Sequence, residues 1–232
     1  MIRLTNRLSA AASLVRGGGS IADVGTDHAY LPVYLCQTGK IKRAVASDIG
    51  EGPLENAART VERFGLSDRI GLRLSDGLAA YAPGEVDEIL ICGMGGELIA
   101  GILRAAPWIC RHGMHLVLQP MSHGVDVRRF LCENGFQIEN ELCVSEGRRV
   151  YLCFSANWTG RDERRPEVYY YFGEIPAADE NARVCQERVY SHLRTRADSL
   201  REAGRLAGEE AALRAVIETY ERMCLDDGQR NF

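Results

Sequence analysis

Long apolar runs are missing from this chain of 232 residues, in which no 18 consecutive residues are all apolar. A membrane-spanning helix needs about 20 such residues. The N-terminus also lacks the pattern of a secretory signal peptide. We therefore expect a cytoplasmic protein with no membrane partner. Its length predicts one full α/β core with a small appendage.

Paired cysteines are missing as well, because none of the eight cysteines forms a Cys-x-x-Cys motif. Six of them lie mostly in apolar patterns typical of reduced core thiols. They are Cys36, Cys92, Cys110, Cys132, Cys143 and Cys153. Cys110, His112 and His115 come nearest to a metal cluster, but their spacing matches no usual zinc arrangement. We expect no metal.

An excess of basic residues is missing too. The chain has 28 basic and 32 acidic residues, a formal charge of −4 and a pI near 5.8, which argues against nucleic-acid binding through overall charge. An RNA partner would therefore need local basic patches, although such runs are usually solvated faces. The candidates are Arg3, Arg7 and Arg16; Lys40, Lys42 and Arg43; and Arg148, Arg149, Arg161, Arg164 and Arg165.

The most informative segment is the apolar strand that ends in Asp23-Val24-Gly25 and leads into a polar turn. In open α/β folds a nucleotide-like cofactor binds at such a strand-to-helix turn. Further glycines of a dinucleotide fingerprint are missing, since Asp27 and Tyr30 stand in their places. A carboxylate repels a pyrophosphate, whereas S-adenosylmethionine has no phosphate and carries a cationic amino group. The turn therefore favours a methyl-donor site over a nicotinamide site.

Acidic residues end the next two expected strands. Asp48 lies 25 residues after Asp23, near the spacing at which an acid reaches ribose hydroxyls. It could also cap the helix expected from Gly52-Pro53 to about Phe64. Asp76-Gly77 ends the third strand, where a carboxylate could meet an adenine amino group, although Asp-Gly is also a common turn.

A fourth strand, Ile89–Cys92, is apolar throughout, as expected for a strand covered on both faces. It runs into Gly93-Met94-Gly95-Gly96 and a helix from about Glu97 to Ala105. These glycines allow close approach of adenosine and substrate, or else serve a turn with positive φ. Gln119 ends a fifth strand and could orient a base, or cap a helix that begins near Asp126.

Two further apolar runs, 136–142 and 150–154, predict a hairpin on the sheet edge. A polar connection at 157–166 then marks a boundary, and beyond Glu174-Ile175-Pro176 two apolar stripes predict two antiparallel helices with a reversal at Gly204 and Gly208. The first stripe is Val184, Val189, Leu193, Ala197, Leu200 and Leu206, and the second is Leu213, Val216, Ile217, Tyr220 and Met223.

The predicted fold is α/β, a Rossmann-like seven-stranded methyltransferase sheet with a C-terminal helical hairpin. Residues 1–157 would form the catalytic domain, and residues 158–232 a linker with a coiled-coil-like helical domain. The hairpin could grip an RNA backbone or serve as a plain dimerisation element, and the two roles are equally supported. Its arginines are Arg183, Arg188, Arg194, Arg196, Arg201 and Arg205.

Four motifs in this order carry a family resemblance. They are residues 23–32 (Asp-Val-Gly-Thr-Asp-His-Ala-Tyr-Leu-Pro), 93–96 (Gly-Met-Gly-Gly), 116–120 (Leu-Val-Leu-Gln-Pro) and 134–136 (Asn-Gly-Phe). Across about residues 3–155 the chain resembles the bacterial tRNA (adenine-22) N1-methyltransferase family. The resemblance implies S-adenosylmethionine as cofactor, tRNA as partner and N1 of adenine 22 as methyl acceptor. Thr26 replaces the usual Ser, and Met121 replaces the usual Asn.

Methylation at adenine N1 needs no prior deprotonation, so positioning should dominate. The product is cationic, and Asp27 could stabilise the developing charge, unless it only caps the following helix. His28 and Tyr30 would shape the pocket while Gln119 orients the base. The catalytic candidates are thus Asp27, Tyr30 and Gln119. The cofactor-binding candidates are Asp23, Gly25, Thr26, His28, Asp48, Ile49, Asp76, Gly77, Gly93 and Met94.

Other functions remain open at this point. The fold and a donor site do not specify the acceptor, so another RNA position or a small molecule could be methylated. A non-catalytic RNA-binding protein with the same fold is a further alternative. A nicotinamide-dependent oxidoreductase is weakened by the missing glycines.

Overall fold

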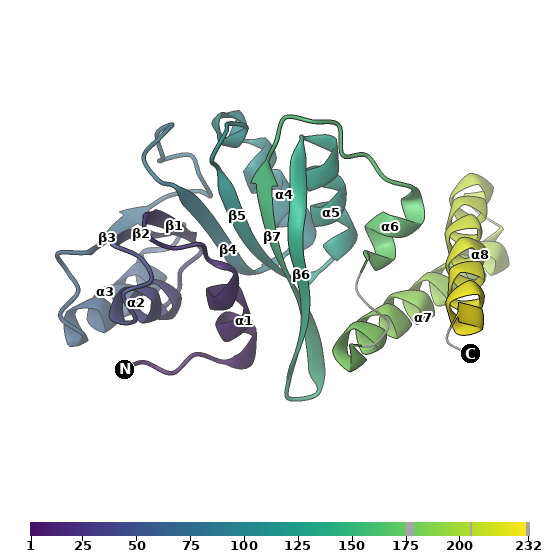
Figure 1. The fold of residues 1–232 in the computed structure, drawn as a ribbon, viewed down its shortest axis with the longest axis horizontal. Helices are drawn as coiled ribbons and strands as arrows, with labels where there is room; N and C mark the ends of the chain where they lie inside the picture. The colour runs from purple at the N-terminus through teal and green to yellow at the C-terminus, as the bar shows by residue number, and fades with distance from the viewer. Residues whose placement is uncertain (175–178, 205, 231–232) are drawn as a thin grey trace. The chain divides into compact units, whose positions relative to one another are not determined.

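The computed structural model describes residues 1–174, 179–204 and 206–230, with residues 226–230 described by their backbone alone. The chain divides into two units, residues 1–164 and 165–232. Figure 1 shows the strands of the first unit as one twisted sheet and the second unit as helices.

One seven-stranded sheet forms the first unit, in the order β3-β2-β1-β4-β5-β7-β6. Strands β1 to β5 are parallel to their neighbours, and β7 is antiparallel to both β5 and β6. The strands are β1 Ser20–Val24, β2 Arg43–Asp48, β3 Ile70–Leu74, β4 Glu88–Gly95, β5 His115–Ser122, β6 Phe136–Glu146 and β7 Arg149–Trp158. The predicted Rossmann-like sheet is confirmed.

Helices cover both faces of this sheet. They are α1 Asn6–Leu14, α2 Tyr30–Gln37, α3 Glu51–Arg63, α4 Gly96–Arg104 and α5 Gly124–Glu133, with the short 3-10 helix η1 Pro107–Ile109. In β4, Ile89 and Ile91 pack into the core that includes α4 and α5, whereas Leu90 packs into the core that includes α1, α2 and α3. Alternate side chains therefore fill two cores, which explains why β4 is apolar throughout.

Several strands extend beyond their predicted ends. Strand β4 continues through Gly95, with register shifts against β5 on both sides of Met94, so the glycine run is partly strand and only partly turn. The hairpin of β6 and β7 pairs as far as Glu146 and Arg149 and extends beyond the rest of the sheet in Figure 1. Beyond the predicted apolar runs, the hairpin residues form strand pairs only between β6 and β7. Strand pairing therefore continues past the point where the apolar sequence pattern ends.

The second unit contains helices α6 Glu167–Phe172, α7 Glu180–Ala203 and α8 Ala207–Arg230. Helices α7 and α8 run antiparallel, since Arg196 pairs with Glu209 and Tyr190 with Glu221. Their predicted stripes meet in a core of Leu193, Ala197, Leu213, Val216 and Ile217.

Two features of this unit differ from the prediction. Helix α6 was not predicted, because its six residues are too few to show a helical period, yet it adds Val168 and Phe172 to the core. Leu206 does not continue the first stripe, since it is 63% exposed and has a φ of +55°. Residues Ile175 and Pro176 of the predicted connection lie outside the described residues.

The described residues include neither a helix that could span a membrane nor a cluster of metal-binding side chains. There, every helix is too short or too polar to cross a bilayer. The same residues contain no group of three or more His, Cys, Asp or Glu side chains arranged to hold a metal ion. His115 is instead buried beside Glu88, with 2.8 Å between Nδ1 and Oε2.

Candidate active site

The backbone of the turn after β1 is hydrogen-bonded to the backbone of β2. The N–H groups of Gly25 and Thr26 both donate to the carbonyl oxygen of Ser47, at 2.8 and 2.9 Å. The Thr26 hydroxyl donates to Oδ2 of Asp23 at 2.5 Å. Asp23 is 5% exposed, and this burial raises the pKa of its carboxyl group to about 6, against the lowering effect of the Thr26 hydrogen bond. The turn therefore holds a buried acid in a fixed position.

Two residues of this turn that are not glycine have left-handed backbone. The φ angles are +51° at Asp27 and +54° at Ala29, a conformation that costs roughly 1–2 kcal/mol for a residue with a side chain. Ala29 is the N-cap of α2, which has no side-chain cap in the structure, so the alternative role of Asp27 as a helix cap is wrong. The Asp27 carboxylate is instead 64% exposed, 3.5 Å from Nε2 of His28.

Asp48, at the end of β2, faces this turn. Its Oδ1 accepts from the N–H of Gly50 at 3.0 Å, and its Oδ2 accepts from the N–H of Asp27 at 3.4 Å. The N-cap of α3 is Gly50 itself, so Asp48 orders the approach to the helix without capping it. Each carboxylate oxygen has a second lone pair, which leaves acceptors for a bound hydroxyl.

The end of β3 lies beside Asp48. The N–H of Ser75 donates to the Asp48 carbonyl oxygen at 2.9 Å, and the Ser75 hydroxyl donates to the carbonyl oxygen of Gly77, also at 2.9 Å. Asp76, between them, is exposed. The structure thus brings Asp23, Asp48 and Asp76 to the carboxyl ends of three neighbouring strands, as the sequence predicted.

Met94, at the end of β4, packs against the turn after β1. A Cβ atom added at Gly25, where φ is +73°, would stand 2.0 Å from Met94 Cε. Gly25 is therefore required by its backbone conformation, and a Cβ atom there would also displace the Met94 methyl group at the end of a flexible side chain. Gly96 serves a different purpose from cofactor approach, because a Cβ there would stand 2.1 Å from the carbonyl oxygen of His123.

Gln119, inside β5 and three residues before the last residue of the strand, is fully buried. Its Nε2 donates to the carbonyl oxygen of Pro120 at 2.9 Å and lies 3.7 Å from Sδ of Met121. Its Oε1 accepts from Nη1 of Arg7 at 2.9 Å. The Gln119 amide thus has partners within the protein for both its NH₂ group and its oxygen, and it fixes the side chain of Arg7. The sequence had placed Arg7 in a candidate basic patch. Local patterns cannot reveal this contact, because the two residues are 112 positions apart.

His28 and Tyr30 form a stacked pair beside the turn. Their ring centroids are 5.0 Å apart with an interplanar angle of 9°, and Tyr30 is 41% exposed. The strained backbone at Asp27 and Ala29 flanks His28 and sets its direction. The pair presents an aromatic surface at the start of α2.

Exposed apolar side chains gather at the same edge. Eight large apolar side chains of residues 1–164 are exposed, and five of them end or closely follow the parallel strands β1 to β5. These five are Tyr30, Ile49, Leu74, Leu98 and Met121. An acid-rich, apolar edge of this kind suits a flat ligand that has hydroxyl and amino groups.

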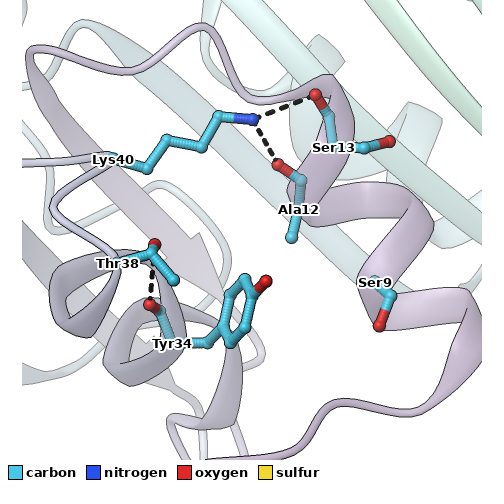
Figure 2. A pocket seen from close by; sticks show the side chains of 6 residues that line it. All are labelled: Ser9, Ala12, Ser13, Tyr34, Thr38 and Lys40. Carbon is cyan, nitrogen blue, oxygen red and sulfur yellow. Dashed lines mark hydrogen bonds between the residues drawn. The ribbon is translucent and has the colours of Figure 1, made fainter. Parts of the chain in front are cut away.

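A cavity of about 420 Å³ lies elsewhere, between α1 and α2, and is lined by Ser9, Ala12, Ser13, Tyr34, Thr38 and Lys40. Figure 2 shows Lys40 reaching across it to the end of α1. Its Nζ donates to the carbonyl oxygens of Ala12 and Ser13, at 2.7 and 3.0 Å. Lys40 precedes β2, so this cavity lies at the amino ends of the strands, away from the acidic edge.

Several of the predicted basic residues are engaged within the protein. Lys40 donates to carbonyl oxygens in the last turn of α1, and Arg16 contacts both carboxylate oxygens of Glu139 at 3.1 Å. In the C-terminal unit, Arg196 pairs with Glu209. Arg205 lies outside the described residues. The basic patches are therefore less available to RNA than their sequence suggests.

The chain is similar to known methyltransferases. A family model described as a methyltransferase domain matches residues 4–154. The tRNA (adenine(22)-N(1))-methyltransferase of Bacillus subtilis is 38% identical over 161 residues, which cover 69% of this chain and 68% of that protein.

Two solved structures are similar over nearly the whole chain. The B. subtilis M1A22 tRNA methyltransferase TrmK superposes with a TM-score of 0.82 and 29% identity, covering 95% of this chain and 97% of that one. TrmK of M. capricolum, in complex with S-adenosyl-homocysteine, superposes with a TM-score of 0.75 and 27% identity, covering 94% and 97%. The resemblance seen in the motifs is confirmed, and the chain belongs to the tRNA (adenine-22) N1-methyltransferase family.

Proposed function

We propose that this protein transfers a methyl group from S-adenosylmethionine to N1 of adenine 22 in tRNA. The observation that carries the proposal is the joint placement of Asp23, Asp48 and Asp76 at the carboxyl ends of β1, β2 and β3, in a chain of this family. The order of these acids along the sheet matches the order of groups in an adenosine-containing cofactor.

The residues present fit this cofactor. Asp48 keeps acceptors for ribose hydroxyls, and Asp76 is exposed where an adenine amino group would lie. Ile49 and Leu74, which are 70% and 54% exposed, would cover the adenine faces. When bound, S-adenosylmethionine supplies an electrophilic methyl group. The exposed backbone of Gly93 allows the reacting groups to approach closely.

The acceptor base would lie on the other side of the turn. There the stacked rings of His28 and Tyr30 offer a platform for an unpaired adenine. N1 of neutral adenine has its lone pair available, so these residues need only orient it. The exposed carboxylate of Asp27 would stabilise the positive charge that develops on the base. N1 takes part in Watson–Crick pairing, so the enzyme must receive adenine unpaired or flipped out.

Gln119 has a different role in this proposal from the one predicted. Its amide is buried and engaged by Arg7 and Pro120, so it acts as a positioning residue for Arg7. Met121, two residues on and 39% exposed, is closer to the surface where the base would lie. It provides apolar contact in place of the amide that the family usually has there.

The proposed partner is tRNA and the proposed compartment is the cytoplasm. Exposed Arg148 and Arg149, at the tip of the β6–β7 hairpin, are candidates for contact with the RNA backbone. The C-terminal helices could add further contacts, although Arg196 and Arg201 are paired with Glu209 and Asp198.

The test is to incubate the purified protein with methyl-labelled S-adenosylmethionine and unmodified bacterial tRNA, then to digest the RNA and map the label. A matched tRNA with guanine in place of adenine 22 is the control. We expect 1-methyladenosine at position 22 and no label in the control. Label at another position would redirect the proposal to a different RNA site. Cofactor binding without any label would indicate a non-catalytic protein or a different acceptor.

A further inference from the structure

We infer that His123 reads the acceptor base, with Nε2 of its imidazole accepting a hydrogen bond from the N6 amino group of adenine. This inference deepens the function proposed above and rests on it. It assigns a specificity-determining role to a residue outside all four family motifs. His123 lies two positions after Met121, where this chain departs from the family.

The order of the strands sets where the acceptor base meets the cofactor. Cofactor adenine at the end of β3 and ribose at the end of β2 leave the methyl group toward β1 and β4, because the sheet order is β3-β2-β1-β4-β5. The next strand ends along this edge are those of β4 and β5. A base that stacks by its face on the turn after β1 would therefore have its edge read from these two ends.

Few side chains at these two ends can accept a hydrogen bond. Residues 93–96, at the end of β4, are three glycines and one methionine. In β5, the buried amide of Gln119 is engaged within the protein, and Met121 carries only a thioether, a weak acceptor. Ser122 and His123 follow, and both are exposed. They are the polar side chains that β5 brings to this edge.

His123 is held in an unfavourable backbone conformation. Its φ is +53°, in the left-handed region that residues with a side chain rarely adopt. Its carbonyl oxygen packs closely on Gly96, where an added Cβ atom would stand 2.1 Å from it. His123 is the N-cap of α5, yet its side chain makes no capping hydrogen bond. The backbone is thus tied to the end of β4 while the ring is left for another purpose.

The Ser122 hydroxyl orients this ring. It is the one polar partner of the imidazole among the residues that the structure describes, with 3.1 Å between His123 Nδ1 and Ser122 Oγ. Ser122 pairs with Gly95, and its Oγ would stand 3.6 Å from a Cβ atom added there. In a neutral imidazole, the partner of one nitrogen sets which nitrogen carries the proton. With Nδ1–H donating to the hydroxyl oxygen, Nε2 keeps its lone pair as an acceptor.

Adenine suits such an acceptor. A hydrogen bond from its N6 amino group orients the base and leaves the N1 lone pair for the methyl group. Attack by N1 spreads positive charge onto N6, which makes the amino group a stronger donor. The bond therefore strengthens in the transition state and raises kcat as well as affinity. Guanine has a carbonyl oxygen at this position, which would face the lone pair of Nε2.

The test compares two tRNA substrates, one with adenine at position 22 and one with unsubstituted purine there, which lacks only the amino group. We expect His123→Ala to lower kcat/KM for the adenine substrate about 10- to 100-fold, the usual range for a lost hydrogen bond to a group that becomes charged. The purine substrate should lose less than about 3-fold. Comparing the two losses removes the different intrinsic reactivity of the bases. Affinity for S-adenosylmethionine should not change.

Three further variants sharpen the test. His123→Gly removes the same ring and relaxes the backbone, so it should show the same selective loss even if His123→Ala folds poorly. Ser122→Ala should reduce the preference for adenine by a smaller factor, because it removes only the partner that orients the ring. His112→Ala is the matched control, since His112 is an exposed histidine that precedes β5, at the opposite end of the strand.

An equal loss for both substrates in His123→Ala and His123→Gly, or no loss for either, would overturn the inference. So would a lost preference for adenine in Glu97→Gln or Asp27→Asn alone, because these exposed carboxylates are the rival acceptors. The wild type tests the proposed function separately. If it methylates adenine 22 and the histidine variants keep its preference, only the role of His123 is wrong. If it leaves adenine 22 unmethylated, the proposed function is wrong and the inference falls with it.

Discussion

The hydroxyl of Thr26 donates to the carboxylate of Asp23 across 2.5 Å, inside a turn that has almost no solvent around the acid. Burial raises the pKa of Asp23 to about 6, even though the Thr26 bond lowers it. This pair therefore makes the stability of the proposed cofactor turn sensitive to pH near neutrality.

Asp23→Asn should remove this sensitivity. The Asp23 pKa is higher in the folded state than its ordinary value of 3.8, so the protonated carboxyl group stabilises the folded state fully below pH 3.8. This stabilisation is lost as the pH rises through about 6. Between pH 5 and pH 8 that loss is about 1.4 kcal/mol. Urea unfolding should show the stability of Asp23→Asn, relative to wild type, rising by this amount over the same range.

Thr26→Val is the companion variant. Loss of the hydroxyl removes the one contact that lowers the Asp23 pKa through its side chain, so the pH dependence should move to higher pH. A stability difference between Asp23→Asn and wild type that stays constant with pH would contradict the assignment.

Gly25→Ala should be slightly more costly than a comparable change at a glycine with open space around it. Gly25 and Gly65 both have positive φ, +73° and +63°, but only at Gly25 would a Cβ meet another atom, 2.0 Å from Met94 Cε. We expect Gly65→Ala to cost roughly 1 kcal/mol from backbone strain alone. Gly25→Ala should cost roughly 1–2 kcal/mol from backbone strain, plus a small amount for moving the Met94 methyl group, which ends a flexible side chain. Chemical unfolding of both variants measures the difference.

The steric part can be isolated with Met94→Ala. In a double-mutant cycle, Met94→Ala should recover less than about 1 kcal/mol of the cost of Gly25→Ala, because only a mobile methyl group has to be displaced. Additive effects would show that the cost arises only from the backbone at Gly25. Cofactor affinity, measured on the folded fraction, should follow the same order.

The sequence predicted the sheet and the acids at its edge because both depend on local patterns. Apolar strands such as 89–92 are buried on both faces, and a residue at the end of a parallel strand must lie at one edge of the sheet. Asp23, Asp48 and Asp76 could therefore be placed from their positions alone. The ends of β4 and β5 were less predictable, because Gly95 and Ser122 are held in the sheet by pairing with each other and not by their own propensity.

Contacts between distant segments could not be read from local patterns. Arg7 and Gln119 come from an N-terminal helix and a central strand, 112 positions apart, and neither sequence neighbourhood indicates the other residue. The same holds for Glu88, which sequence reasoning passed over, although it fastens the end of helix α1 to the sheet. The contacts of such residues can be identified only in the folded structure, where helix α1 packs against the sheet.

Glu88→Gln should detach the segment after α1. The buried Glu88 carboxylate accepts from the N–H groups of Arg16 and Gly17, at 3.0 and 2.8 Å, and contacts His115. Burial opposes its ionisation, but these hydrogen bonds hold the pKa of Glu88 below its ordinary value. A glutamine keeps one acceptor oxygen but presents its NH₂ group to the other donor, so we expect a loss of about 1–3 kcal/mol in the free energy of unfolding. Glu139→Gln, at a half-exposed pair with Arg16, should cost less than about 1 kcal/mol.

Tyr30 provides the clearest test of how the acceptor base is held. Its ring stacks on His28 and is 41% exposed, so its proposed contribution to catalysis is stacking and not proton transfer. Stacking of a base on an aromatic ring contributes about 1–3 kcal/mol. Tyr30→Ala should therefore lower kcat/KM for tRNA by roughly 10- to 100-fold, while leaving the affinity for S-adenosylmethionine unchanged.

Tyr30→Phe separates the ring from the hydroxyl. It keeps the stacking surface, so its kcat/KM should stay within about 2-fold of wild type, far from the loss expected on removal of the ring. Tyr34→Phe, one turn along α2 at the separate cavity, controls for removal of a hydroxyl from the same helix. If Tyr30→Phe lost as much activity as Tyr30→Ala, the hydroxyl would be the working group. The base would then be held at this position by hydrogen bonding. In that case, support of an aromatic stacking surface would not explain the strained backbone around His28.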